Sequence, residues 1–315
     1  MLRLGVTGRI GQVAQALVAR GPLQAFDVVT LARPDCDLRD ADSIARTIAA
    51  AGCDIVVNAA AYTAVDRAES EPDLATAINT EGARQVARAA KIHGLPIIQI
   101  STDYVFDGQA ARPYREDDAP APLGAYGRSK LAGELAVAEA CADHVILRTA
   151  WVYGATGQNF VRTMLRLGET RGLVGVVADQ YGAPTYAPDL ADVICAIAAQ
   201  LVARPEASEL RGIFHATGQG AASWADLAEA IFAGAARRGR APVRVDRITT
   251  QDYPTPAQRP KNSRLDMQKL AATYGLHMPD WRPSLETCLD CLVAPSQEYL
   301  SQERVTAERP AKECS

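Results

Sequence analysis

A glycine-rich turn near residue 10 reads Gly5-Val-Thr-Gly8-Arg-Ile-Gly11-Gln-Val-Ala14. Apolar residues that predict a strand precede it, and a predicted helix begins at its third glycine. Gly8 and Gly11 allow a tight turn and a close backbone approach to a pyrophosphate, and free N–H groups at the helix N-terminus favour anions. Ala14 stands where a further glycine is usual and is small enough for the helix to pack on the strand. The turn predicts a dinucleotide-binding unit.

Short apolar runs and amphipathic stretches of helical length continue to alternate beyond this turn. Such alternation is typical of a parallel sheet with helices on both faces. The predicted strands are Leu2–Thr7, Asp27–Leu31, Ile55–Asn58, Pro96–Ile100 and Val145–Arg148. The predicted helices are Gly11–Ala19, Asp42–Ala51, Leu74–His93 and Tyr126–Cys141. The sequence therefore predicts an α/β protein with a doubly wound parallel sheet of the Rossmann type.

The alternation loosens after about residue 153, and this suggests three parts. Residues 1–153 are the predicted NAD(P)-binding domain, with the catalytic helix at 126–141. Residues 154–293 carry Gly- and Pro-bearing segments between helices and are expected to be mainly a smaller C-terminal substrate-binding part. Residues 294–315 are polar, so a disordered tail is expected there.

Composition and charge exclude several classes of protein. The 315 residues include 33 Lys and Arg and 37 Asp and Glu, a formal charge of -4. Nucleic acid and anionic membrane are therefore not expected partners. No apolar run approaches the ~20 residues of a membrane span, and no signal peptide precedes the first strand, so a cytoplasmic location is expected. Seven dispersed cysteines indicate reduced thiols, and Cys288 and Cys291 lack further ligands at zinc spacing, so no metal site is predicted.

The end of the second predicted strand bears on the cofactor. An acidic residue there usually holds the ribose 2′-OH of NAD, whereas this strand ends in Leu31-Ala-Arg33. Arg33 suits a 2′-phosphate, so NADPH is the expected cofactor and NADH stays open. Arg33 can equally be an ordinary solvated charge. Asp37 and Leu38 are placed to meet the adenine ring.

The predicted helix at 126–141 begins with Tyr126-Gly-Arg-Ser-Lys130, and Ser101-Thr102 ends the fourth strand. Residues four apart lie on one face of a helix. A phenol has an ordinary pKa of ~10, and a nearby ammonium lowers that pKa because it favours the phenolate. Thr102 or Ser101 can orient a carbonyl oxygen beside the phenol. The set predicts Tyr126 as a proton donor in carbonyl reduction, with Lys130 tuning it.

Longer motifs resemble the dTDP-4-dehydrorhamnose reductase family of the extended short-chain dehydrogenase/reductase superfamily. They follow the family's order from residue 5 to about residue 290. Besides the glycine-rich turn, the matching stretches are Val57-Asn-Ala-Ala-Ala-Tyr-Thr-Ala-Val-Asp-Arg-Ala-Glu-Ser70, Ser101-Thr-Asp-Tyr-Val-Phe-Asp-Gly108, Tyr126-Gly-Arg-Ser-Lys-Leu-Ala-Gly-Glu134, Arg148-Thr-Ala-Trp-Val-Tyr153, Asp179-Gln-Tyr-Gly-Ala-Pro-Thr185 and Arg259-Pro-Lys-Asn-Ser-Arg264.

The resemblance implies roles for residues that the local patterns leave unassigned. It adds to Gly8 and Arg33 a set of cofactor residues: Gly11, Gln12, Val13, Asp37, Leu38, Ala61, Tyr62, Thr63, Tyr126 and Lys130. It places Thr102, Asp103 and Trp151 at the sugar, although Trp151 can equally be a core residue. Arg259 suits a diphosphate, because a guanidinium binds phosphate oxygens bidentately, although it can also be a surface charge.

The implied reaction transfers hydride from NAD(P)H to the C4 carbonyl of dTDP-4-dehydro-L-rhamnose, while Tyr126 protonates the oxygen. The product would be dTDP-L-rhamnose for cell-envelope polysaccharide. Ala16 and Pro188 stand where some members of the family place magnesium-binding glutamates at a dimer interface. A magnesium-bridged dimer is therefore not expected, and another homodimer stays open.

Two other functions fit parts of this pattern. The regulatory subunit of methionine adenosyltransferase resembles the family along its length, can keep Tyr-x-x-x-Lys and is a non-catalytic binding module. Another nucleotide-sugar reductase or an epimerase would share the fold. The presence of Thr102, Trp151 and Arg259 together favours the reductase.

Overall fold

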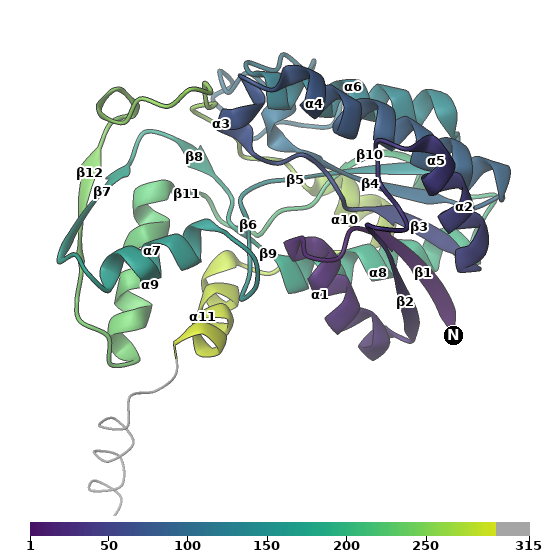
Figure 1. Cartoon of the computed structure of the whole chain (residues 1–315). Coiled ribbons are helices and arrows are strands. Elements are labelled where there is room, and N and C mark those ends of the chain that lie inside the picture. Colours follow the sequence, from purple (N-terminus) through teal and green to yellow (C-terminus); the bar gives the residue numbers. More distant parts are fainter. Residues whose placement is uncertain (294–315) are drawn as a thin grey trace, which may run out of the picture.

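A six-stranded parallel sheet forms the centre of the larger lobe in the computed structural model, which describes residues 1–293 (Figure 1). Its strand order is β10-β5-β4-β3-β1-β2. In chain order the strands are β1 (Leu2–Thr7), β2 (Phe26–Leu31), β3 (Ile55–Asn58), β4 (Ile97–Thr102), β5 (His144–Thr149) and β10 (Gly212–His215). The five predicted strands are confirmed, each end within two residues of its predicted place.

Helices cover both faces of this sheet because its central strands are apolar on both sides. Leu4 and Val6 of β1 face a core that they share with α1, α8 and α10, whereas Val56 of β3 and Ile97 of β4 face α2, α5 and α6. These helices are α1 (Gln12–Arg20), α2 (Ala41–Ala51), α5 (Ala83–Ile92), α6 (Ala125–Ala140), α8 (Ala187–Ala203) and α10 (Gln268–Tyr274). The predicted doubly wound α/β fold is confirmed.

The segment that leads into α5 is more irregular than the predicted helix Leu74–His93. Two short helices, α3 (Val65–Ala68) and α4 (Pro72–Thr76), are followed by a π-helical segment at Ala77–Gly82. Such wide turns displace a helix by one residue and are frequent at functional sites. Here the displacement turns Asn79 into the interior, where its side chain is 3% exposed.

Three elements after residue 153, α8, β10 and α10, join the first lobe. β10 pairs in parallel with β5, and α8 packs against α1. The sequence analysis did not predict β10, a four-residue strand among glycine-bearing segments. The boundary after residue 153 stays a prediction.

The smaller lobe has its own apolar core beneath a two-stranded parallel sheet. Its main elements are α7 (Phe160–Gly168), β7 (Leu173–Val177), α9 (Trp224–Arg237), β12 (Arg244–Ile248) and α11 (Trp281–Leu292). Two short pairs join β6 (Val152–Tyr153) to β9 (Thr185–Tyr186) and β8 (Tyr181–Gly182) to β11 (Ala222–Ser223).

Some further predictions can be placed on this fold. Cys288 and Cys291 lie on α11, a helix as expected. Every helix within residues 1–293 is too short or too polar to cross a lipid bilayer. The predicted tail at 294–315 lies outside the described residues.

Candidate active site

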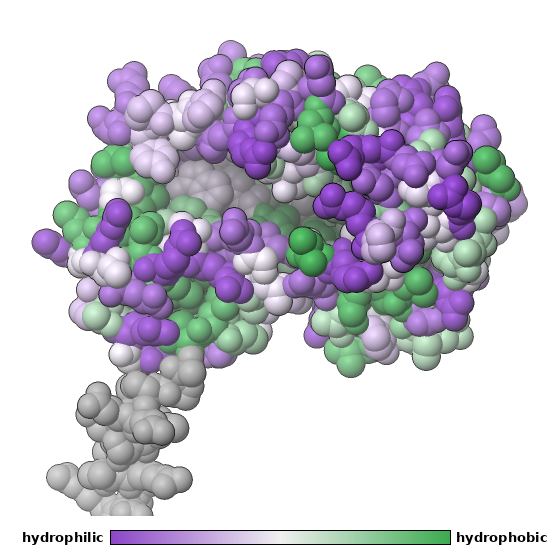
Figure 2. Space-filling model, in the orientation of Figure 1, coloured by the Kyte–Doolittle hydropathy of each residue, from purple (hydrophilic) through white to green (hydrophobic). Residues whose placement is uncertain are grey.

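The predicted site residues gather where the parallel strands end. Thr102 ends β4 and is the register partner of Thr149 at the end of β5, and Trp151 follows two residues later. Ligands bind at this carboxyl edge in open α/β sheets. Figure 2 shows a hollow between the two lobes, on the side where β5, β6 and β8 run in Figure 1.

The glycine-rich turn presents an open helix N-terminus. Gly8 has φ +88°, which favours glycine, and Gly11 is the N-cap of α1. No side chain caps α1, its first turn carries no acidic residue, and a Cβ at Gly11 would meet nothing within 4 Å. Backbone N–H groups are therefore available to an anion, and the turn fits a pyrophosphate.

Gln12 joins this turn to the smaller lobe. Its Nε2 donates to the carbonyl oxygen of Val152 at 3.2 Å, and its Oε1 accepts from Asn159 Nδ2 at 3.0 Å. The neighbouring Val13 packs against the core beneath α1. Both side chains thus hold the turn in place. The backbone N–H groups of the turn are then the groups available to a cofactor.

The loop after β2 brings a second guanidinium near Arg33. Arg33 is exposed, whereas Arg39 donates to both carboxylate oxygens of Asp37, at 3.2 and 2.9 Å. These contacts with Arg39 lower the pKa of Asp37 to about 2. Leu38 lies between them in sequence and packs towards Gly82. Arg39, which the sequence analysis missed, neutralises the carboxylate and leaves Arg33 as the more available cation.

Asn79 fixes the loop Ala61–Thr63 at the end of β3. Its Oδ1 accepts from Tyr62 N at 2.8 Å, and its Nδ2 donates to Tyr62 O at 3.0 Å and to Ser129 Oγ at 2.9 Å. One buried amide thereby links this loop to α6. Sequence reasoning did not find Asn79, because the π-helical segment that turns it inward gives no pattern in the sequence.

Tyr126 lies in the first turn of α6, with 9% of its surface exposed. The turn is fixed by Glu69 Oε1, which accepts from Ala125 N at 2.7 Å. The Tyr104 ring meets the Tyr126 ring edge-on, with centroids 5.5 Å apart. Burial raises the pKa of Tyr126, and the Thr102 hydroxyl opposes that rise. The structure therefore brings Tyr126 and Thr102 together, as predicted.

The Lys130 ammonium is bound to the sheet in this structure. Its Nζ donates to the carbonyl oxygen of Ile100 in β4 at 2.7 Å, and the pKa of Tyr126 is raised rather than lowered. The spacing of four puts both residues on one helix face, but the long lysine side chain extends to the sheet. Burial lowers the pKa of Lys130 to about 8, against the opposing charge of Glu134.

A buried ion pair lies beneath these residues. Arg148 of β5 donates from Nε and Nη2 to Glu134 of α6, at 2.9 and 2.7 Å, and Ser101 Oγ donates to Glu134 at 2.5 Å. The Arg148 and Glu134 side chains are 1% and 2% exposed. Of the two predicted orienting hydroxyls, Ser101 is therefore committed to Glu134.

Asp103 contributes a buried carboxyl next to Thr102. Thr102 Oγ1 donates to Asp103 Oδ1 at 2.9 Å, whereas Oδ2 has no partner within residues 1–293. Burial raises the pKa of Asp103 to about 7, opposed by hydrogen bonds that include one from Ser263. Ser263 N also donates to Tyr181 O at 2.7 Å, so this serine ties the site to β8. The sequence analysis quoted Ser263 within a motif but gave it no role.

Arg259 lies at the border between the lobes and already holds a carboxylate. It donates from both terminal nitrogens to Asp66 of α3, at 3.0 and 2.8 Å, and the side chain is 22% exposed. The guanidinium thus adopts the bidentate geometry expected for an anion. A protein carboxylate occupies it here, a contact that spans 193 residues of sequence.

Trp151 packs against the smaller lobe. Its ring stacks on Trp224, with centroids 3.5 Å apart, and its backbone adopts φ 49°. Its carbonyl oxygen accepts from Thr185 N at 3.1 Å. Trp224 is a second aromatic residue that sequence reasoning did not single out.

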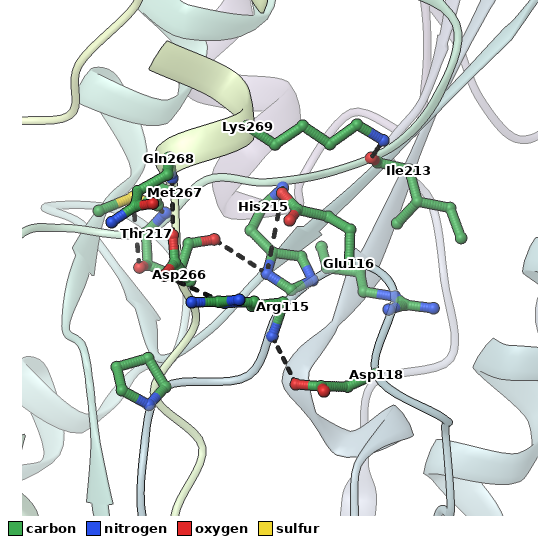
Figure 3. A network of polar contacts seen from close by, with 12 residues as sticks. Arg115, Glu116, Asp118, Ile213, His215, Thr217, Asp266, Met267, Gln268 and Lys269 are labelled. Atoms are coloured by element: carbon green, nitrogen blue, oxygen red, sulfur yellow. Dashed lines mark hydrogen bonds and ion pairs between the residues drawn. The ribbon is translucent and has the colours of Figure 1, made fainter. Parts of the chain in front are cut away.

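A separate polar network lies at the edge strand β10 (Figure 3). Glu116 accepts from His215 N at 3.0 Å, and Lys269 donates to Ile213 O at 2.7 Å, so both satisfy backbone groups of this strand. His215 is fully buried, and burial lowers its pKa to about 3. An adjoining cavity of about 570 Å³ is lined by none of Tyr126, Thr102, Asp103 and Lys130. Such capping blunts a sheet edge that could otherwise pair with another chain.

Residues 1–293 contain no group of three or more His, Cys, Asp or Glu side chains that could hold a metal ion. Ala16 of α1 is buried in the core that α1 shares with α8. Pro188 lies in the first turn of α8. Near them, Arg20 of α1 pairs with Asp192 of α8 at 2.5 Å.

Comparison with known proteins identifies the family. The model of the RmlD substrate binding domain matches residues 2–294. A dTDP-4-dehydrorhamnose reductase of Sinorhizobium fredii is 48% identical over 283 residues, which cover 90% of this chain and 95% of the relative. Crystal structures of dTDP-4-dehydrorhamnose reductases from Clostridium acetobutylicum and Bacillus anthracis each give a TM-score of 0.84 at 37% identity, over 92% of this chain and 99% of the other. The Bacillus anthracis structure is a complex with NADP.

These matches span nearly the whole length of both partners, and they confirm the resemblance seen in the motifs. The chain belongs to the dTDP-4-dehydrorhamnose reductase family.

Proposed function

We propose that this protein reduces the C4 keto group of dTDP-4-dehydro-L-rhamnose to give dTDP-L-rhamnose, with Tyr126 as the proton donor. The observation that carries the proposal is the buried grouping of Tyr126, Thr102 and Asp103 at the carboxyl edge of the sheet, with Lys130 on the same helix. Relatives of high coverage bear the name of this activity.

The residues fit NADPH, which would supply the hydride. Gly8, Gly11 and the uncapped N-terminus of α1 would hold the pyrophosphate. Arg33 would take the 2′-phosphate, with Asp37 and Leu38 near the adenine. The loop Ala61–Thr63 and Lys130 would face the ribose and nicotinamide end. NADP in the Bacillus anthracis relative supports this choice, and NADH stays open.

Tyr126 would hold and deliver the proton. Because burial raises its pKa, the phenol keeps its proton at neutral pH. An alkoxide is far more basic than a phenolate, so protonation of the C4 oxygen by this phenol is downhill. Lys130, with a pKa of about 8, is still mostly cationic at pH 7 and would offset the charge left on Tyr126.

Thr102 and Asp103 would orient the sugar. Thr102 lies beside Tyr126, and Asp103, whose Oδ1 accepts a hydrogen bond from Thr102, would fix the direction of that hydroxyl beneath the sugar. Burial raises the pKa of Asp103 to about 7, so this carboxyl can also carry a proton and donate a hydrogen bond. Arg259 would bind the diphosphate after releasing Asp66, which its bidentate geometry suits.

The test follows NADPH oxidation and product identity with purified protein and dTDP-4-dehydro-L-rhamnose. The proposal predicts one NADPH oxidised for each dTDP-L-rhamnose formed. An epimerase would convert substrate without net NADPH consumption, and a non-catalytic regulatory module would bind cofactor without turnover. Either result would reject the proposal.

A further inference from the structure

The indole of Trp151 is enclosed by two neighbours. Trp224, the first residue of α9, stacks on it with an interplanar angle of 7°. A Cβ added to Gly182 would lie 2.4 Å from Cε2 of Trp151, 2.6 Å from Nε1 and 2.7 Å from Cζ2. A point closest to Cε2, which is a ring-fusion atom, lies over the ring and not beside its edge.

Gly182 and Trp224 must therefore lie on opposite faces of the indole. Carbon atoms in contact are about 3.5–4.0 Å apart, so stacked rings at 3.5 Å leave no room for a backbone between them. Both faces of Trp151 are covered. A ligand at the carboxyl edge of β5 can reach only the edge of this ring.

That edge carries an available donor. Trp151 Nε1 makes no hydrogen bond within residues 1–293. Unlike the unpaired Nε1 of Trp281, it is not fully buried. The left-handed backbone at Trp151 indicates that its surroundings impose this orientation. Gly182 is also linked to the site. The carbonyl oxygen of its neighbour Tyr181 accepts a hydrogen bond from Ser263 N, and Ser263 lies beside Asp103.

We propose that Trp224 is a positioning residue of the sugar subsite. Together with Gly182 it holds Trp151 edge-on, so that the indole N–H donates a hydrogen bond to a sugar oxygen and offers no face for stacking. The assignment rests on the proposed function for the presence of a sugar at Trp151.

A spectroscopic test examines the stack without substrate. Closely stacked indoles couple and give an exciton couplet in circular dichroism. Trp151→Phe and Trp224→Phe should each abolish the couplet, whereas Trp281→Phe should retain it because Trp281 lies outside the pair. A couplet that survives both single changes would overturn the stacked arrangement.

A kinetic test examines the role of the stack. Trp151→Phe keeps an aromatic face but lacks the N–H, so KM for dTDP-4-dehydro-L-rhamnose should rise about tenfold, or ~1.4 kcal/mol, with little change in kcat. Trp224→Ala should raise KM similarly by freeing one face, and Trp224→Phe should largely rescue it. Gly182→Ala, which pushes the indole from the other side, serves as a second perturbation if Trp224→Ala unfolds.

The outcomes separate the two proposals. Absence of turnover by the wild-type protein would reject the proposed function. Wild-type turnover combined with an unchanged KM in Trp151→Phe would reject only the donor role of the indole. Wild-type turnover with an unchanged KM in both Trp224→Ala and Gly182→Ala would reject the positioning role.

Discussion

Replacing Glu134 by glutamine should strongly destabilise the protein. Glu134 accepts two hydrogen bonds from Arg148 and one from Ser101, and the two charged side chains are only 2% and 1% exposed. Breaking a buried pair leaves an uncompensated charge and costs about 3–5 kcal/mol. At about 2–4 °C per kcal/mol, the melting temperature should fall by roughly 10 °C.

The assay is thermal unfolding followed by circular dichroism, with Glu209→Gln as the matched control. Glu209 pairs with Arg204 at 2.5 Å, but the side chains are 57% and 50% exposed, so the control should lose at most about 1 kcal/mol. Glu134→Leu combined with Arg148→Met should recover much of the loss, because no buried charge remains. If Glu134→Gln melts within the shift of the control, the buried pair does not hold α6 against the sheet as argued.

Three further predictions concern pH and substrate binding. The pKa of Asp103 is raised from 3.8 to about 7, so the burial of this carboxyl costs stability as pH rises through that range. In urea unfolding, Asp103→Asn should be more stable than wild type at pH 8 but not at pH 4, and an equal gain at both pH values would contradict this. The pKa of His215 is lowered from 6.5 to about 3, so the free energy of unfolding should fall as pH falls through that range. His215→Asn should lose less stability over the same range, and an unchanged dependence of unfolding free energy on pH in the same assay would disprove the linkage. Arg259→Lys should raise KM for the nucleotide sugar about tenfold with kcat nearly unchanged, because an ammonium cannot pair bidentately. The measurement is steady-state kinetics at saturating NADPH, and an unchanged KM would show that Arg259 does not bind the substrate.

Local patterns were sufficient to predict most of the fold. The five strands are apolar runs between turn residues, and the Gly8 and Gly11 turn stands between the first strand and its helix, as in dinucleotide-binding units. The spacing of Tyr126 and Lys130 correctly put both on one helix. Each of these signals lies within a few residues of sequence, where periodicity and turn chemistry act.

Contacts between distant segments could not be predicted in this way. Asp66 and Arg259 form an ion pair although 193 residues separate them in sequence. β10 is a strand because it pairs with β5 at the edge of the sheet. The long side chain of Lys130 can reach either Tyr126 or a carbonyl, and only the packed sheet decides between them. Asn79 turns into the interior through a π-helical displacement that leaves no period in the sequence.

Single-turnover kinetics of Tyr126→Phe tests the central claim most directly. The substitution removes only the hydroxyl, which interacts with Thr102, and keeps the buried ring, so folding and NADPH binding should persist. Loss of the proton donor should slow NADPH oxidation by about 10²–10⁴-fold. Tyr114→Phe, which removes a buried hydroxyl bonded to Asp107 at 2.6 Å, should retain activity. Turnover by Tyr126→Phe within a few-fold of wild type, with NADPH bound, would show that another group supplies the proton.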